Sequence, residues 1–187
     1  RGRLRLGEAE LAASIDGILN RHPAVGVAVG IVRDGALELL HGHGLADITA
    51  GTPITEDTVF RIGSITKPFT AIAVMQLHEQ GLVDLDAPAT DYLRAYQLVP
   101  ARAGLRPPTV RHLLTHTAGI PEVRHVSDLL HPEAGPFAGR PPILSVRFGE
   151  RLPPLAEHFR RGLRVVAQPG NAFAYSNHGY ATLGQIV

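Results

Sequence analysis

Two side chains that can do nucleophilic chemistry together, Ser64 and Lys67, stand three residues apart. In a helix, residues at this spacing lie on one face, one turn from each other. A serine hydroxyl is a weak nucleophile until a neighbouring base takes its proton, and an amine can be that base only where burial or nearby charge lowers its pKa. The pair therefore predicts covalent catalysis in which Ser64 attacks a substrate and Lys67 helps to move the proton.

The use of lysine in this chain supports that interpretation. The sequence holds seventeen arginines and a single lysine, Lys67. A guanidinium keeps its proton, whereas an amine can lose it. With five serines in 187 positions, one lysine would fall three residues after a serine in roughly 3% of random placements. A requirement for an amine explains the pair better than chance does.

A second polar group, Tyr175 and Asn177, follows the turn signal Pro169-Gly170. The pKa of a phenol falls near an ammonium, so Tyr175 beside Lys67 could act first as a base and then as an acid. The amide of Asn177 could orient Lys67 or bind a substrate carbonyl. Which of Lys67 and Tyr175 is the base stays open, because an amine and a phenol this close titrate as a coupled pair.

The elements that must position these groups begin with a helix and a hairpin. Apolar residues at helical spacing predict a helix over 11–19, which His22-Pro23 ends. Apolar residues alternate over 25–31, Asp34-Gly35 makes a tight turn, and the period of two continues over 37–45 with Leu37, Leu39, His41, His43 and Leu45. An isolated hairpin is marginal in water, so we expect these strands to need further partners.

The strongest helix pattern covers residues 64–80, is apolar nearly all round, and meets a stop at Gly81. It predicts a buried helix. Proline is tolerated only in a first turn, so Pro68 requires the helix to begin close to Ser64. The backbone N–H of Ser64 would then be available to a developing oxyanion.

Two shorter helices are predicted further along. Thr109 can cap a helix through Leu113 and Leu114, and residues 156–163 could form another. Eight of the fifteen prolines lie in residues 121–169, which predicts irregular structure there.

Composition limits the partners. The chain has 44% hydrophobic and 19% charged residues and a net charge of +1, with no extended basic block, so neither nucleic acid nor an anionic membrane is expected. The longest apolar run, residues 24–32, is too short to span a bilayer and lacks signal-peptide flanks. No cysteine is present, which excludes disulfides and thiol catalysis. A small molecule or a peptide, bound as substrate, remains the expected partner. The sequence leaves the oligomeric state open.

Four segments in order resemble one known family. They are 60–67 (FRIGSITK), 81–88 (GLVDLDAP), 110–120 (VRHLLTHTAGI), and 169–170 (PG) with 175–180 (YSNHGY). They are similar to the successive signatures of the class C β-lactamases, a group that also includes D-alanyl-D-alanine carboxypeptidases and certain esterases. The resemblance runs from about residue 24 to 187. It implies a serine hydrolase in which Ser64 is acylated, Lys67 and Tyr175 exchange its proton, and Asn177 binds substrate or steadies Lys67.

The resemblance also implies the fold and the domain organisation. The fold is mixed α/β (α+β) and β-lactamase/transpeptidase-like, an antiparallel sheet flanked by helices with a mostly helical lobe. Residues 1–187 are expected to be an incomplete single catalytic domain, cut short at its C-terminal end. Residues 1–63 would form the N-terminal helix and hairpin of the sheet part, and 64–187 the nucleophile helix and helical lobe. No cofactor or metal is expected, and the parent protein would be extracytoplasmic or membrane-associated.

One family motif is missing from the sequence. A strand bearing Lys or His, any residue, then Gly supplies a second oxyanion N–H in this family and should follow residue 187. Losing one such donor typically costs about 10² to 10³ in rate. We therefore expect the 187-residue segment alone to be inactive and its parent to be active.

Other interpretations stay open. The substrate could be an ester, a D-amino-acid peptide or a β-lactam, because fold and mechanism do not fix it. A non-catalytic, penicillin-binding-like module could keep the scaffold and only recognise peptidoglycan-like or peptide ligands. Finally, His112 with His116, and His41 with His43, have spacings at which zinc must be considered, although the glutamate of the metalloprotease helix motif is absent.

Overall fold

The computed structural model describes residues 7–120, 151 and 153–187. The chain divides into two compact units, Arg1–Arg61 and Ile62–Val187. Most of the proline-rich segment of the sequence lies outside the described residues. Within the part that is described, no helix combines the length and the apolar character that crossing a membrane requires.

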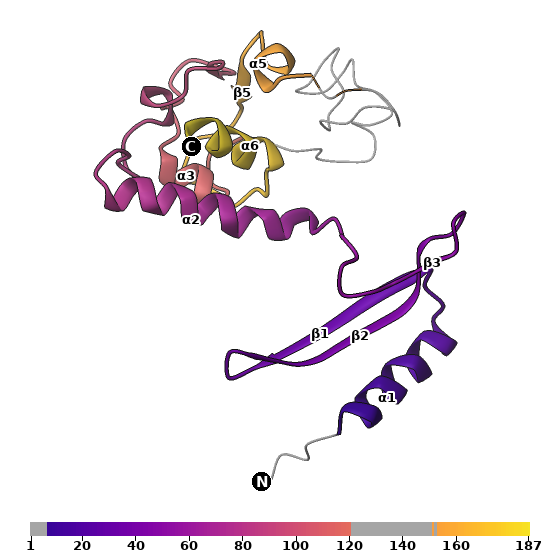
Figure 1. Ribbon diagram of the computed structural model, residues 1–187. Helices are drawn as coiled ribbons and strands as arrows, with labels where there is room; N and C mark the ends of the chain where they lie inside the picture. Colours follow the sequence, from indigo (N-terminus) through magenta and orange to yellow (C-terminus); the bar gives the residue numbers. More distant parts are fainter. Residues whose placement is uncertain (1–6, 121–150, 152) are drawn as a thin grey trace. The chain divides into compact units, whose positions relative to one another are not determined.

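The first unit is a small antiparallel sheet with one helix, α1 (Glu8–Arg21) (Figure 1). Its strands are β1 (Gly26–Arg33), β2 (Ala36–Asp47) and β3 (Thr52–Pro53), in the order β1-β2-β3. Asp34 and Gly35 both have positive φ, 49° and 79°, as a two-residue turn between twisted strands requires. The predicted helix, turn and hairpin are thus present with nearly the predicted bounds.

Two histidines of β2 hold helix α1. The Asp16 carboxylate oxygen Oδ1 lies 3.0 Å from His41 Nε2 and 3.1 Å from His43 Nδ1. Because side chains two apart on a strand point to the same face, both rings meet the one carboxylate. These hydrogen bonds lower the pKa of Asp16 below its usual range. His41 and His43 therefore bind a helix in this fold.

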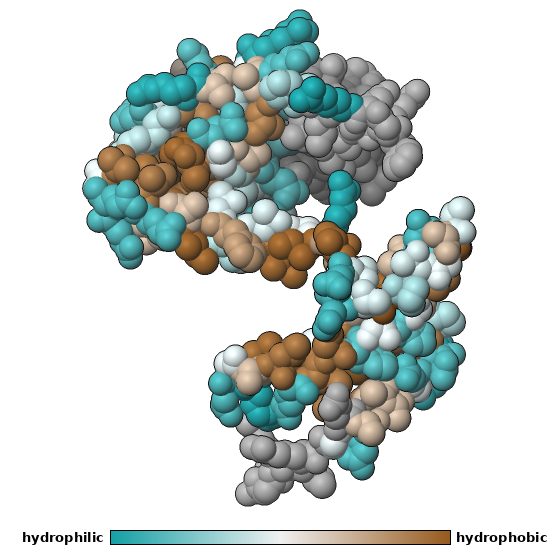
Figure 2. All heavy atoms as spheres, in the orientation of Figure 1, coloured by the Kyte–Doolittle hydropathy of each residue, from teal (hydrophilic) through white to brown (hydrophobic). Residues whose placement is uncertain are grey.

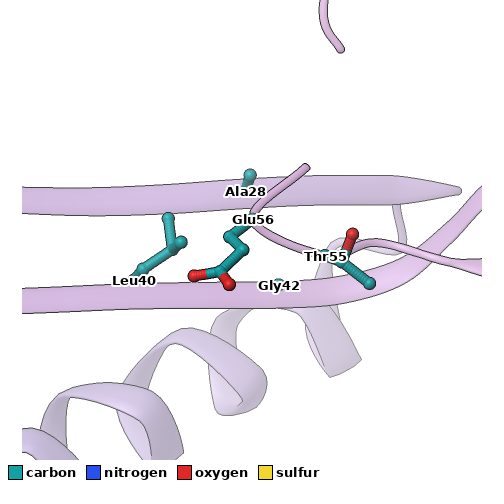
Figure 3. A pocket seen from close by; sticks show the side chains of 5 residues that line it. All are labelled: Ala28, Leu40, Gly42, Thr55 and Glu56. Carbon is teal, nitrogen blue, oxygen red and sulfur yellow. The ribbon is translucent and has the colours of Figure 1, made fainter. Parts of the chain in front are cut away.

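A shallow hollow of about 350 Å³ lies over the sheet of the first unit. It forms where β1 and β2 carry the small residues Ala28 and Gly42. Figure 3 shows the side chain of Glu56 reaching along this hollow toward Leu40.

The second unit is mostly helical. Its elements are η1 (Gly63–Ile65), α2 (Thr66–Glu79), η2 (Ala89–Asp91), β4 (Leu98–Pro100), α3 (Val110–Leu114), α5 (Leu155–His158), β5 (Leu163–Val165) and α6 (Asn177–Ile186). Helix α6 packs against both α2 and α3 (Figure 1). The large apolar side chains buried at the centre of this packing include Val74, Val110, Leu113, Ile120 and Leu183.

Helix α2 has the predicted place, and its ends have clear causes. Pro68 is the third residue of α2, where no intrahelical N–H is needed. At the other end Gly81 has φ +72°; its N–H donates to the His78 carbonyl and that of Leu82 to Leu77. This pair of bonds is the Schellman motif that ends many helices.

The expected burial of this helix is wrong for one face. Val74 is fully buried, but an apolar stripe opposite it is 40% to 64% exposed; it consists of Ile65, Phe69, Ile72 and Met75. Figure 2 shows these hydrophobic residues along α2. An apolar pattern predicts burial only where a partner element exists; within the described residues α6 packs against α2, and Val74 belongs to the buried core.

Of the two shorter helices that the sequence predicts, the second differs from the prediction. Thr109 caps α3 as expected, its Oγ1 accepting the N–H of His112 at 3.3 Å. The helix expected over 156–163 is only α5, and Leu163 begins strand β5, which pairs in parallel with β4. Helix α5 ends at His158, a turn follows that Gly162 closes with φ +82°, and Leu163 N–H then donates to the Gln97 carbonyl.

Candidate active site

The site begins at the start of helix α2, in the second unit. Ser64 is the middle residue of η1, which leads directly into α2, so Lys67 follows one turn later. The Lys67 Nζ atom donates a hydrogen bond to Ser64 Oγ over 3.1 Å. The spacing in the sequence thus produces the contact that it predicted.

Tyr175 and Asn177 complete the cluster from the other end of the unit. The Tyr175 phenol oxygen lies 2.6 Å from Ser64 Oγ, and either oxygen could be the donor. Lys67 Nζ also donates to Asn177 Oδ1 at 2.6 Å. All four residues predicted for the site therefore meet in one hydrogen-bonded group, with Ser64 touching both Lys67 and Tyr175.

The short segment 174–177 is positioned by a helix start. Ser176 is the N-cap of α6, and its Oγ accepts the N–H of Gly179 at 3.0 Å. Asn177 is therefore the first residue of the helix, and Tyr175 directly precedes the cap. Serine is favoured at an N-cap because its hydroxyl satisfies an amide that the helix leaves unpaired.

Sequence reasoning missed Tyr180 as a neighbour of the amine. Lys67 Nζ lies 4.6 Å from the ring centroid of Tyr175 and 5.6 Å from that of Tyr180, so two aromatic rings surround the cation. Burial raises the pKa of Tyr180, with a further contribution from Tyr175, and its phenol donates to the Leu114 carbonyl at 3.0 Å. Tyr180 follows Asn177 by three residues, and residues at this spacing share one face of a helix, which is the signal that could have placed Tyr180 near Lys67.

The predicted burial around the amine is wrong for the residues that the structure describes. Ser64 is exposed, Tyr175 is 41% exposed and Lys67 is half-buried. A pocket of about 370 Å³ opens beside Lys67, between Thr70 of α2, Leu155 of α5 and Tyr180 of α6. Ser64 and Tyr175 are thus accessible from solvent, and Lys67 is the member of the group that lines the pocket.

The second pair of histidines considered for zinc has other partners. His112 Nδ1 lies 3.1 Å from both the N–H and the hydroxyl of Thr109, at the start of α3. His116 Nδ1 accepts the N–H of Ser176 at 3.1 Å. Among the described residues, no group of three or more His, Cys, Asp or Glu side chains could hold a metal ion.

Solved structures share this architecture. The chain aligns with EstCE1, described as a hydrolase with promiscuous acyltransferase activity, at a TM-score of 0.74 and 28% identity over 96% of this chain and 46% of that one. It aligns with a penicillin-binding protein homologue from Pyrococcus abyssi at a TM-score of 0.66 and 32% identity, over 95% and 38% of the two chains. The fold is therefore the mixed α/β, β-lactamase/transpeptidase-like fold.

The chain belongs to the Beta-lactamase family, whose family model matches residues 11–187. It is 40% identical to the esterase EstB of Burkholderia gladioli over 119 residues, 62% of this chain and 30% of that protein. It is 30% identical to penicillin-binding protein 4 of Amycolatopsis lactamdurans over 175 residues, 92% of this chain and 40% of that protein. The chain thus spans 30% to 40% of the length of these two relatives.

Proposed function

We propose that the whole protein is a serine hydrolase that forms an acyl-enzyme on Ser64. The observation that carries this proposal is that one hydroxyl oxygen, Ser64 Oγ, lies within hydrogen-bond distance of both Lys67 Nζ and Tyr175 Oη. A nucleophile in contact with two groups that can carry a proton is the arrangement that activates serine for attack on a carbonyl carbon. Membership of a family with relatives named esterase and penicillin-binding protein supports the same function.

Acylation would proceed by proton transfer and substitution at the carbonyl. The Ser64 proton passes to the coupled pair of Lys67 and Tyr175 while Oγ forms a bond to the carbonyl carbon. When the tetrahedral intermediate collapses, the bond from that carbon to the leaving oxygen or nitrogen breaks. The leaving group takes a proton from Tyr175, which lies nearest to Ser64 Oγ. The acyl group is then an ester of Ser64.

Deacylation would use the same groups in reverse roles. Water gives a proton to the pair and attacks the ester carbon, and Ser64 Oγ leaves with the proton returned to it. Asn177 fixes Lys67 throughout, because its Oδ1 accepts one of the hydrogens on Nζ, which a neutral and a charged amine both carry, at 2.6 Å. Its amide nitrogen could donate to a substrate carbonyl, which is the second role that its residue type allows.

We propose that residues 1–187 form part of one catalytic domain of the whole protein. We also propose that its substrate is a small ester or a D-amino-acid peptide, and we rank β-lactams as the second substrate class. The open setting of Ser64 and the pocket beside Lys67 suit a small molecule or a short peptide. A relative of the chain is named D-aminopeptidase, from Gluconobacter oxydans, and is 29% identical over 181 residues, 30% of that protein.

Covalent labelling of the whole protein tests the proposal. We expect a fluorophosphonate to add one mass increment, Ser64→Ala to abolish the increment, and Ser14→Ala, at an exposed position of α1, to leave it intact. A fluorescent penicillin is the second probe. If neither probe gave an adduct, the protein would be a binding module rather than a hydrolase. Rates on p-nitrophenyl acetate, D-alanyl peptides and nitrocefin would then rank the substrate classes.

A further inference from the structure

We propose that His116 is a positioning residue that fixes the Tyr175 phenol against Ser64. The inference rests on the proposed function, because it concerns how the same site is held. His116 lies two residues after the end of α3. It has φ +57°, and Asp34 is the other described non-glycine residue with positive φ. Glycine and asparagine are the residues that usually take this conformation. An imidazole there points to a requirement for its ring.

His116 holds the chain on both sides of Tyr175. Its carbonyl accepts the N–H of Ala174 at 2.8 Å. Its ring atom Nδ1 accepts the N–H of Ser176 at 3.1 Å. The residues before and after Tyr175 are therefore tied to one residue of the loop after α3, which fixes the backbone position from which the phenol extends.

The ring of His116 also contacts the ring of Tyr175. The two rings are stacked, with centroids 4.5 Å apart and planes at 30°. The Tyr180 ring lies 4.9 Å away at 36°, and Phe173 meets the imidazole by its edge at 5.6 Å. Tyr175 is 41% exposed, and the imidazole lies against one face of its ring. The stack keeps its oxygen where it can lie 2.6 Å from Ser64 Oγ.

The hydrogen bond to Ser176 also defines the form of the imidazole. A backbone amide can only donate, so Nδ1 must present its lone pair, and the ring proton of the neutral form then lies on Nε2. His116 is thus required as an acceptor and as a flat ring at once. Phenylalanine retains the ring without the acceptor, and asparagine retains an acceptor near the position of Nδ1 and tolerates the backbone conformation.

A double-mutant cycle in the whole protein separates positioning from a purely structural role. With p-nitrophenyl acetate we expect His116→Phe to lower kcat on the order of 10- to 100-fold, with KM nearly unchanged, because misplacing a reacting group acts on the chemical step. His116→Asn should restore part of the loss. In a Tyr175→Phe background, His116→Phe should have little further effect, since the phenol that it positions is gone. His112→Phe, which removes a ring acceptor that contacts Thr109 instead, is the matched control and should keep kcat.

Three results would overturn the inference: an unchanged kcat in folded His116→Phe, equal losses with and without the Tyr175 phenol, or no rescue by asparagine. Circular dichroism checks that each variant is folded. If His116→Phe does not fold, the loss in kcat caused by His116→Asn is compared between the protein with Tyr175 and the Tyr175→Phe variant. Equal losses in the two would again overturn the inference. Fluorophosphonate labelling of the unmodified protein keeps the two proposals apart. If Ser64 is not labelled, the proposed function fails; if it is labelled and the cycle is additive, only the role of His116 fails.

Discussion

Ser64 and Tyr175 stand 111 residues apart in the sequence, and their side-chain oxygens lie 2.6 Å apart. A contact at this separation is made by the fold as a whole, since one residue comes from the start of α2 and the other from the segment before α6. The packing of α6 against α2 brings the two ends together. The chemistry of the site therefore depends on that packing as much as on the residue types.

Replacing Lys67 with arginine tests the need for an amine. Arginine keeps the positive charge and can still donate to Asn177, but it cannot take up the Ser64 proton. We expect Lys67→Arg to lower kcat/KM of the whole protein about 10² to 10⁴-fold, the usual contribution of a proton-transfer group. Steady-state rates with p-nitrophenyl acetate measure this loss. Activity within a few-fold of the unmodified protein would show that Lys67 serves only as a charge.

Removing the phenol oxygen of Tyr175 should be equally harmful. Tyr175→Phe keeps the stack on His116 and deletes the atom that lies 2.6 Å from Ser64 Oγ. We expect a loss in kcat of about 10² to 10⁴-fold without loss of stability.

Tyr96→Phe is the matched control for that substitution. The Tyr96 phenol is buried and lies 2.9 Å from Thr182 Oγ1, away from the four site residues. Its removal should cost about 0.5 to 1.5 kcal/mol of stability and leave kcat unchanged. If thermal unfolding and kinetics gave the same result for both variants, Tyr175 would have no special part in the reaction.

Gly119 should be far less tolerant of alanine than Gly81. Both have positive φ, +68° and +72°, but a Cβ at Gly119 would lie 2.2 Å from the Ala167 carbonyl oxygen, whereas one at Gly81 meets no atom within 4 Å. We expect Gly81→Ala to cost about 1 to 2 kcal/mol from backbone strain alone, and Gly119→Ala a total of roughly 2 to 5 kcal/mol because packing must also shift. Urea unfolding of the two variants measures the difference, and equal costs would contradict the close approach seen here.

The link between α1 and β2 should weaken in acid. The pKa of Asp16 is lowered by its hydrogen bonds to His41 and His43, so the folded state favours the charged carboxylate. That stabilisation is present above the ordinary aspartate pKa of about 4 and is lost as pH falls through the lower folded value. We expect Asp16→Asn to reduce the urea midpoint at pH 7 and to have a smaller effect near pH 2. A difference that stayed constant over this range would show that the charge of Asp16 plays no part.

Much of this arrangement could be predicted from the sequence, because the relevant signals are local. The Asp34-Gly35 turn, the Thr109 cap and the Gly81 stop each depend on the conformational preference of one or two residues, and each is confirmed. The fold class follows from the order of the motifs and is confirmed by the solved structures. The roles of Ser64, Lys67, Tyr175 and Asn177 stay predictions, although the structure places the four side chains together.

The features that could not be predicted depend on distant contacts. Strands β4 and β5 have three residues each and pair across more than sixty positions, so neither carries a recognisable alternation. The exposed side of α2 was missed because an apolar pattern does not say which elements are available to cover it. His116 was missed because its hydrogen bond and its stack join it to residues sixty positions away.

The N-cap between Tyr175 and Asn177 makes the length of this tripeptide critical for protein engineering. Each residue of a helix is rotated by about 100° from the one before it. Inserting a single residue between Ser176 and Asn177 would therefore swing the amide of Asn177 a quarter-turn or more around the axis of α6 and away from Lys67, and deleting the residue after Ser176 would remove that amide. Libraries designed to alter selectivity should vary side chains in this region while conserving the residue count between the phenol and the amide.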